Sequence, residues 1–114
     1  MMKIDLSQLE LHDANLLGIS LDPVGRTAEV RLAYYSNEPS AERVLGTLRF
    51  TDVTQFNVMA DLDLLEEHAK FGNVSQFVSG ERAGVSYIYL ARGLIAVTAT
   101  SAELIGSGLP FVAV

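Results

Sequence analysis

Apolar and polar residues alternate along much of this chain, and such alternation is the two-residue period of a β-strand. The alternation is clearest in residues 85–100, VSYIYLARGLIAVTAT. It predicts a central hairpin of two strands joined at Arg92-Gly93, with Gly93 supplying the positive φ of a tight turn. Further strands are predicted over residues 14–21, 27–35, 43–50 and 73–78.

Residues 61–71, DLDLLEEHAKF, depart from this alternation and follow the period of a helix. Their apolar stripe is opposed by a charged face, which consists of Asp63, Glu66, Glu67 and Lys70. Asp61 or Asp63 can cap the start of such a helix, and Gly72 can follow its end. The sequence therefore predicts one helix, placed before the last three strands.

The two ends of the chain carry weaker patterns. Residues 1–10 are predicted to form a short strand or an irregular lead-in. The apolar tail over residues 102–114 is predicted to pack against the fold or against another subunit, because exposed contiguous apolar surface favours association. The predicted fold is a single mainly β domain over residues 1–114, bordering on α+β. It has five or six mostly antiparallel strands in meander order, as a sandwich or half-open barrel with one helix.

Composition narrows the function classes. The chain has 114 residues, of which 49% are hydrophobic and 19% charged, and this profile is typical of a globular domain with a core of its own. It contains no cysteine, which excludes zinc fingers, iron–sulfur clusters, thioredoxin-like redox sites and cysteine nucleophiles. Charged residues interrupt the first apolar runs, so neither a signal peptide nor a membrane span is predicted. We expect a cytoplasmic protein without a cofactor or a structural metal.

The charge balance bears on the partners. The net charge is −6, and the eight basic residues are scattered along the chain. Binding to a phosphate backbone depends on clustered cations, so nucleic acid and anionic membranes are not expected as partners. An acidic surface suits a basic protein partner, although it also serves solubility alone.

His12 and Asp13 form the most distinctive dipeptide. An imidazole beside a carboxylate can act as a general base or bind a ligand, and Asp52 or His68 could complete a small hydrolytic or ligand-binding site. In the structural alternative, Asp13 accepts hydrogen bonds from backbone amides and His12 packs at the end of a sheet. Adjacent residues of an extended chain point to opposite faces, so a shared site requires a bend at this position. No nucleophile elbow, metalloprotease motif or phosphate-binding loop accompanies the pair.

Two other groups of side chains are candidate binding surfaces. The acidic helix face could dock a basic protein or bind a cation, although it lacks the glycine and distal glutamate of a calcium loop, and it could equally be only solvated. Its residues are Asp61, Asp63, Glu66 and Glu67. The tyrosines could line a ligand pocket or serve only in packing. They are Tyr34, Tyr35, Tyr87 and Tyr89.

The element Leu11-His12-Asp13-Ala14, followed by the hairpin ISLDPVGRTAEVRLAY, resembles a diffuse group of small bacterial proteins that open with a His-Asp-Ala element. The resemblance extends to residues 48–53 and to the final hairpin with Gly93, and Leu11 stands where these proteins often have an aromatic residue. Some members are labelled immunity proteins of toxin systems, and the resemblance implies no catalytic residues.

These observations together favour a non-enzymatic binding or interaction protein. In the sharper form of this hypothesis, the chain is an immunity-type inhibitor of a basic protein. The alternative is a small ligand-binding or hydrolytic domain that uses His12 and Asp13. A subunit of a larger assembly is a third class, and we expect a homo-oligomer formed through the apolar tail or an edge strand.

Overall fold

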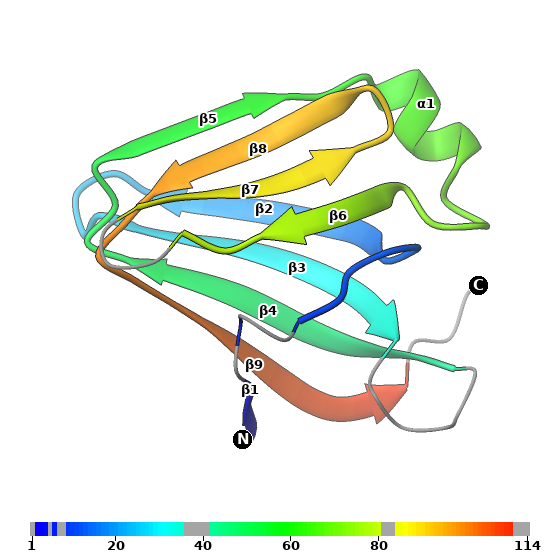
Figure 1. Cartoon of the computed structure of the whole chain (residues 1–114), viewed down its shortest axis with the longest axis horizontal. Coiled ribbons are helices and arrows are strands. Elements are labelled where there is room, and N and C mark those ends of the chain that lie inside the picture. Colours follow the sequence, from blue (N-terminus) through cyan, green and yellow to red (C-terminus); the bar gives the residue numbers. More distant parts are fainter. Residues whose placement is uncertain (1, 5, 7–8, 36–41, 81–83, 111–114) are drawn as a thin grey trace.

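A computed structural model describes residues 2–4, 6, 9–35, 42–80 and 84–110 of the chain. Within them the chain forms nine strands and one helix (Figure 1). In chain order these are β1 (Met2–Ile4), β2 (Asn15–Asp22), β3 (Thr27–Tyr35), β4 (Arg43–Thr51), β5 (Gln55–Met59), α1 (Leu62–Glu67), β6 (Val74–Val78), β7 (Val85–Leu90), β8 (Gly93–Thr98) and β9 (Ser101–Pro110).

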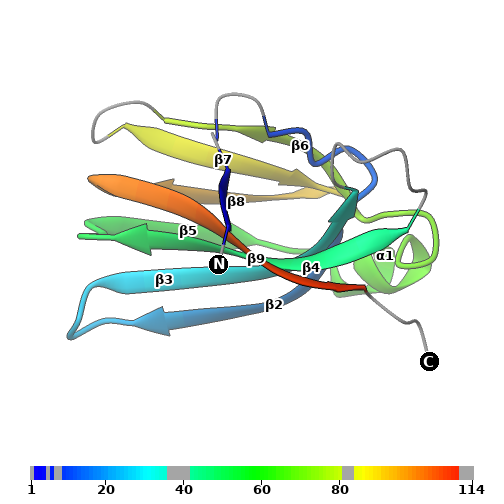
Figure 2. The same ribbon diagram turned by 90° about the horizontal axis from the view of Figure 1, so that it is seen from below.

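The strands form two antiparallel sheets that face each other. The five-stranded sheet has the order β1-β9-β4-β3-β2, and the four-stranded sheet has the order β5-β8-β7-β6. Figure 2 shows the two layers from a second side, with α1 at one end of the molecule. The predicted mainly β sandwich with one helix is confirmed, and the six segments predicted as strands correspond to β2, β3, β4, β6, β7 and β8.

The C-terminal tail packs against the fold, which is one of its two predicted arrangements, and it does so as a strand that was not predicted. Residues 101–110 form β9, which lies between β1 and β4 and places Leu104 opposite Leu48. The strand order is therefore not a simple meander, because the end of the chain returns to the first sheet. Residues 111–114 lie outside the described residues. Residues 101–110 pair with other strands of the same fold, and a contact of the tail with another subunit stays a prediction.

The short strand β5 was also missing from the sequence prediction. Phe56 and Val58 point toward the other sheet, since they pair with the buried residues Val97 and Ile95 of β8. Five residues at the edge of a sheet give only two inward positions, and that is too few for a clear period.

The turn of the central hairpin corrects a further prediction. Leu90 pairs with Gly93, so the turn consists of Ala91 and Arg92, and the positive φ of 53° belongs to Arg92. Glycine is required at position 93 for another reason, because a Cβ there would collide with the carbonyl oxygen of Met59 in β5. Its missing side chain therefore permits the close approach of two strands.

Helix α1 is shorter than the predicted helix. Asp61 caps it by accepting a hydrogen bond from Leu64 N at 3.1 Å, and His68 is its C-cap. The chain then continues as a turn in which Gly72 N donates to His68 O at 2.8 Å, so Lys70 is not in a helical last turn. Among the described residues, no helix has both the length and the apolar character that crossing a membrane requires.

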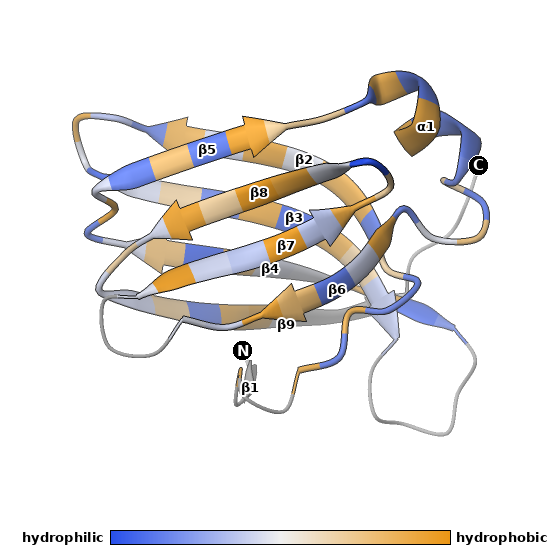
Figure 3. Ribbon diagram, turned by 45° about the horizontal axis from the view of Figure 1, so that its top comes forward, coloured by the Kyte–Doolittle hydropathy of each residue, from blue (hydrophilic) through white to orange (hydrophobic). Residues whose placement is uncertain are grey.

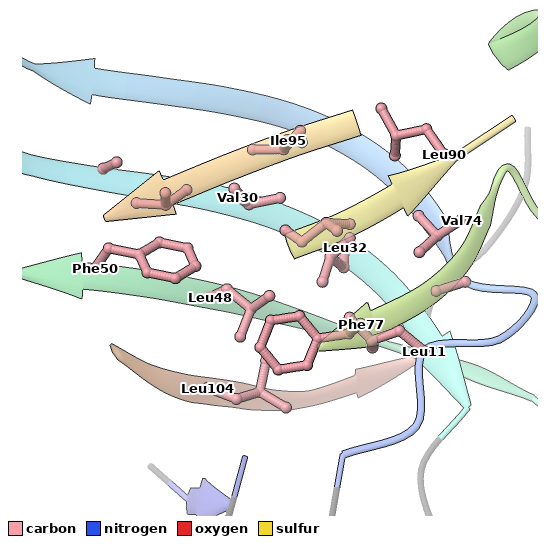
Figure 4. Close-up of a cluster of buried hydrophobic side chains, with 14 of the residues drawn as sticks. Leu11, Val30, Leu32, Leu48, Phe50, Val74, Phe77, Leu90, Ile95 and Leu104 are labelled. Carbon is pink, nitrogen blue, oxygen red and sulfur yellow. The ribbon is translucent and has the colours of Figure 1, made fainter. Parts of the chain in front are cut away.

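The core lies between the sheets and takes side chains from almost every strand (Figure 4). Leu11, in the segment before β2, is fully buried in it. Tyr34 is also buried, and a Cβ at Gly46 would lie 2.7 Å from the Tyr34 ring. Burial raises the pKa of the Tyr34 phenol, because desolvation disfavours the charged phenolate. Tyr34 is thus a neutral core residue.

Gly72 provides a test of the contact between the turn after α1 and the segment before β2. Its φ is 115°, and a Cβ there would lie 2.5 Å from the backbone of Asp13. We expect Gly72→Ala to lower the free energy of unfolding by about 2–4 kcal/mol, through backbone strain and overpacking. Gly106→Ala is the control, because its Cβ would meet only the Tyr34 hydroxyl at 3.4 Å. Equal urea midpoints for the two variants would contradict this account.

Candidate functional site

His12 and Asp13 lie on a sharp bend before β2. Asp13 has a φ of 65°, and Ala14 N donates to Leu11 O at 2.9 Å across the bend. The bend brings the two side chains together, with His12 Nε2 at 3.5 Å from Asp13 Oδ2. The bend that a shared site requires is therefore present, and the opposite-face rule does not apply because it holds only for extended backbone.

The chemistry of this pair is that of an exposed contact. The side chains of His12 and Asp13 are 68% and 53% exposed, so water screens their interaction strongly. His12 Nδ1 lies 3.3 Å from Ser75 O, and His12 N donates to Glu10 Oε1 at 3.0 Å. Over the part of the chain that the structure describes, no three His, Asp or Glu residues are placed to hold a metal ion.

The backbone of the bend is held from two sides. Arg43, the first residue of β4, donates through Nε and Nη2 to the carbonyl oxygen of Asp13 at 3.1 and 3.0 Å. The same guanidinium lies 5.0 Å from the ring centroid of Tyr35. On the other side, Asp13 N donates to Val74 O at 3.0 Å. The bend therefore joins the edge of β6 to the start of β4. Within the described parts of the chain, the carboxylate of Asp13 contacts His12 and caps no backbone amide, whereas the structural alternative supposed such a cap.

Two buried asparagines, Asn15 and Asn73, connect the sheets next to this bend, and we call them the asparagine clasp. Asn15 Oδ1 accepts from Asn73 N at 3.2 Å, and Asn73 Oδ1 accepts from Leu16 N at 2.8 Å. Their amide groups donate to the end of the helical segment: Asn15 Nδ2 to Ala69 O at 2.6 Å, and Asn73 Nδ2 to Leu65 O at 3.0 Å. The clasp thus binds β2, β6 and α1 to one another.

Sequence reasoning missed the asparagine clasp. An asparagine next to a turn is ordinarily explained by local hydrogen bonds to its own backbone. Asn15 and Asn73 each stand at the start of a predicted strand, and nothing in the sequence indicates that the two segments meet. The only available signal is that each asparagine directly precedes apolar strand residues.

The structure separates Asp52 from the His12 site. Asp52 follows the last residue of β4, whereas Arg43, which contacts Asp13, is the first residue of that strand. Nine strand residues span roughly 30 Å, so Asp52 lies at the far end of the sheet. Its Oδ2 accepts a hydrogen bond from Thr100 Oγ1 at 3.0 Å. His68 is engaged through its backbone as the C-cap of α1. The constellation of His12, Asp13 and Asp52 is therefore not assembled.

The predicted acidic residues divide into two roles. The carboxylate of Asp61 accepts from Leu64 N and serves as the helix cap. The side chains of Asp63, Glu66 and Glu67 are exposed, and the last turn of α1 contains no basic residue. Leu62, in the same helix, is 74% exposed. We call Leu62, Asp63, Glu66 and Glu67 the acidic helix surface.

The tyrosines do not form a common pocket. Tyr34 is buried in the core, and Tyr35 lies beneath Arg43 on the five-stranded sheet. Tyr87 and Tyr89 stack on each other in the four-stranded sheet, with ring centroids 6.0 Å apart. The packing interpretation therefore suits all four of them.

We expect the asparagine clasp to contribute much more to the free energy of unfolding than the contact between His12 and Asp13. Asn73→Ala leaves Leu16 N and Leu65 O without partners in a largely buried place, so we expect the free energy of unfolding to fall by about 2–4 kcal/mol. His12→Ala, at the same corner, should change it by less than about 0.5 kcal/mol, because His12 is exposed. Chemical denaturation of both variants measures the difference. A large loss for His12→Ala, or none for Asn73→Ala, would contradict these assignments.

Known proteins offer no further guide to this site. A scan against models of protein families finds no match, and searches of curated proteins and of solved structures find none either. The two surfaces whose geometry could serve a function are the His12–Asp13 bend and the acidic helix surface.

Proposed function

We propose that this chain is a non-enzymatic binding protein of the cytoplasm that docks a basic protein partner through the acidic helix surface. The observation that carries the proposal is the exposure of three carboxylates around Leu62, an apolar side chain that is itself 74% exposed. A large exposed apolar group on the same short helix as charges of one sign suits an interface anchor with a polar rim.

Charge supports the choice of a basic partner. The chain carries a net charge of −6, and α1 contributes Asp63, Glu66 and Glu67 to it without a compensating base in its last turn. A basic protein would be steered to this surface over long range, which raises the rate of association and makes it sensitive to salt.

The contacts that hold α1 against the rest of the fold support the same proposal. Leu65 is buried in the core, and the carbonyl oxygens of Leu65 and Ala69 accept hydrogen bonds from the asparagine clasp. A short helix fixed in this way loses little conformational freedom when a partner binds. The resemblance of residues 11–14 to proteins of which some are labelled immunity proteins agrees with this proposal, in which the partner would be a toxin.

The proposal is tested by reversing charge on α1. Glu66→Lys combined with Glu67→Lys should abolish capture of a basic partner from lysate of the source cells, and leave the denaturation midpoint near that of the wild type. Wild-type capture should itself weaken as salt is raised, because screening removes the attraction. The matched control is Glu29→Lys with Glu42→Lys, which changes the net charge equally at residues outside both candidate surfaces. Equal capture by the helix variant and the wild type would refute the role of α1.

A second candidate function has one specific observation in its favour. His12 and Asp13 do meet, at 3.5 Å, on an exposed bend, so a small ligand or a partner side chain could reach both. Including His12→Ala in the same capture experiment separates the candidates. Capture that is lost with His12→Ala and retained with the charge reversal on α1 would assign the binding site to the bend.

A further inference from the structure

Among the described residues, the outward side chains of the four-stranded sheet include no charged group. The strand register arranges its outward side chains in three rows across the sheet. The rows are Gln55, Thr98 and Val85; Asn57, Ala96, Tyr87 and Val78; and Met59, Leu94, Tyr89 and Gln76. The residues between them along the strands point into the core, as the burial of Val97, Ile95 and Ile88 shows. We call these eleven residues the neutral face.

The outer face of the five-stranded sheet, in contrast, carries charged residues of both signs. Its outward positions include a row in which Glu29 stands opposite Arg49, and Arg49 stands opposite Glu103. Arg31 and Arg43 belong to the same outer face. Charge of both signs is the usual cover of a solvated sheet, so its complete lack on the neutral face of a chain with a net charge of −6 needs an explanation.

Large side chains of the neutral face are open to solvent. Met59 is 70% exposed, Val78 39% and Tyr89 38%. Figure 3 shows the four strands of this sheet at the front of the molecule, with no element lying over them. Neutral amides, tyrosines and a methionine are also the mixture that protein interfaces favour over charged groups.

We propose that the neutral face is a self-association surface, on which a second copy of this chain packs face to face about a two-fold axis. In a two-fold contact each side chain meets the same surface on the other copy, so a charged face would oppose like to like near the axis. Two copies with a net charge of −6 each repel one another, and the neutral face is where they can touch without bringing carboxylates together.

The size of the surface sets the strength of the contact. Four strands about 4.8 Å apart and six residues long cover roughly 20 Å by 20 Å, or about 400 Å² in projection. Specific interfaces bury about 800 Å² of accessible surface per partner, and a rough face has more accessible surface than its projection. The dimer is therefore weak and depends on concentration.

Sedimentation of the full chain, from micromolar to about millimolar concentration, tests the proposal. We expect the wild type to approach twice the monomer mass. Asn57→Asp with Gln76→Glu keeps the shape of two amides and adds four negative charges to the dimer, and Ala96→Glu places a carboxylate at the centre of the face. Each variant should raise the dissociation constant at least about tenfold. Thr47→Glu, at the centre of the other outer face, should leave it unchanged.

Salt distinguishes this dimer from the basic partner proposed above. Raised salt screens the repulsion between the two acidic copies, so self-association should strengthen or stay constant, whereas capture by the acidic helix surface should weaken. A monomer at every concentration would overturn the proposal and would leave the neutral face to a different protein. Dimers that persist in both face variants, or that Thr47→Glu weakens equally, would overturn it as well.

Discussion

The reciprocal hydrogen bonding of Asn15 and Asn73 is the constraint on which the arrangement of the molecule depends. Each side chain accepts from the other segment's backbone and donates to a carbonyl at the end of the helical segment. Together they join β2 at the edge of one sheet, β6 at the edge of the other and the only described helix. Because both asparagines are buried, their own amide groups would otherwise be desolvated without a partner. The clasp also fixes the position of the bend that carries His12 and Asp13.

The outer faces of the two sheets differ in charge, and this difference connects the fold with the proposed functions. Charges of both signs cover the outer face of the five-stranded sheet, while the four-stranded sheet presents neutral side chains and α1 presents carboxylates. Such a division allows two contacts with opposite responses to salt. An acidic patch attracts basic proteins, and a neutral face tolerates a second acidic copy.

The sequence was sufficient for the strands with long alternation, for the sandwich and for the single helix, because burial on one face imposes a period that can be read directly. It was insufficient where tertiary contacts decide. The residues of β9 alternate through Ala102, Glu103 and Leu104, yet glycines follow at 106 and 108, and the tail was predicted to pack without being assigned as a strand. The contact between His12 and Asp13 depends on one positive φ at Asp13, which no two-residue pattern reveals. The clasp joins residues 58 positions apart, so no local signal exists.

Native-state amide hydrogen exchange, read residue by residue, tests the central role of the clasp most directly. The amides of Leu16 and Asn73 donate to the clasp, although Leu16 stands in an edge strand and Asn73 precedes one. If the clasp holds the sandwich together, both amides exchange only through global unfolding, as slowly as those of Leu32 and Ile95 in the inner strands β3 and β8. Rapid exchange of Leu16 and Asn73 by local opening, while Leu32 and Ile95 stay protected, would contradict it.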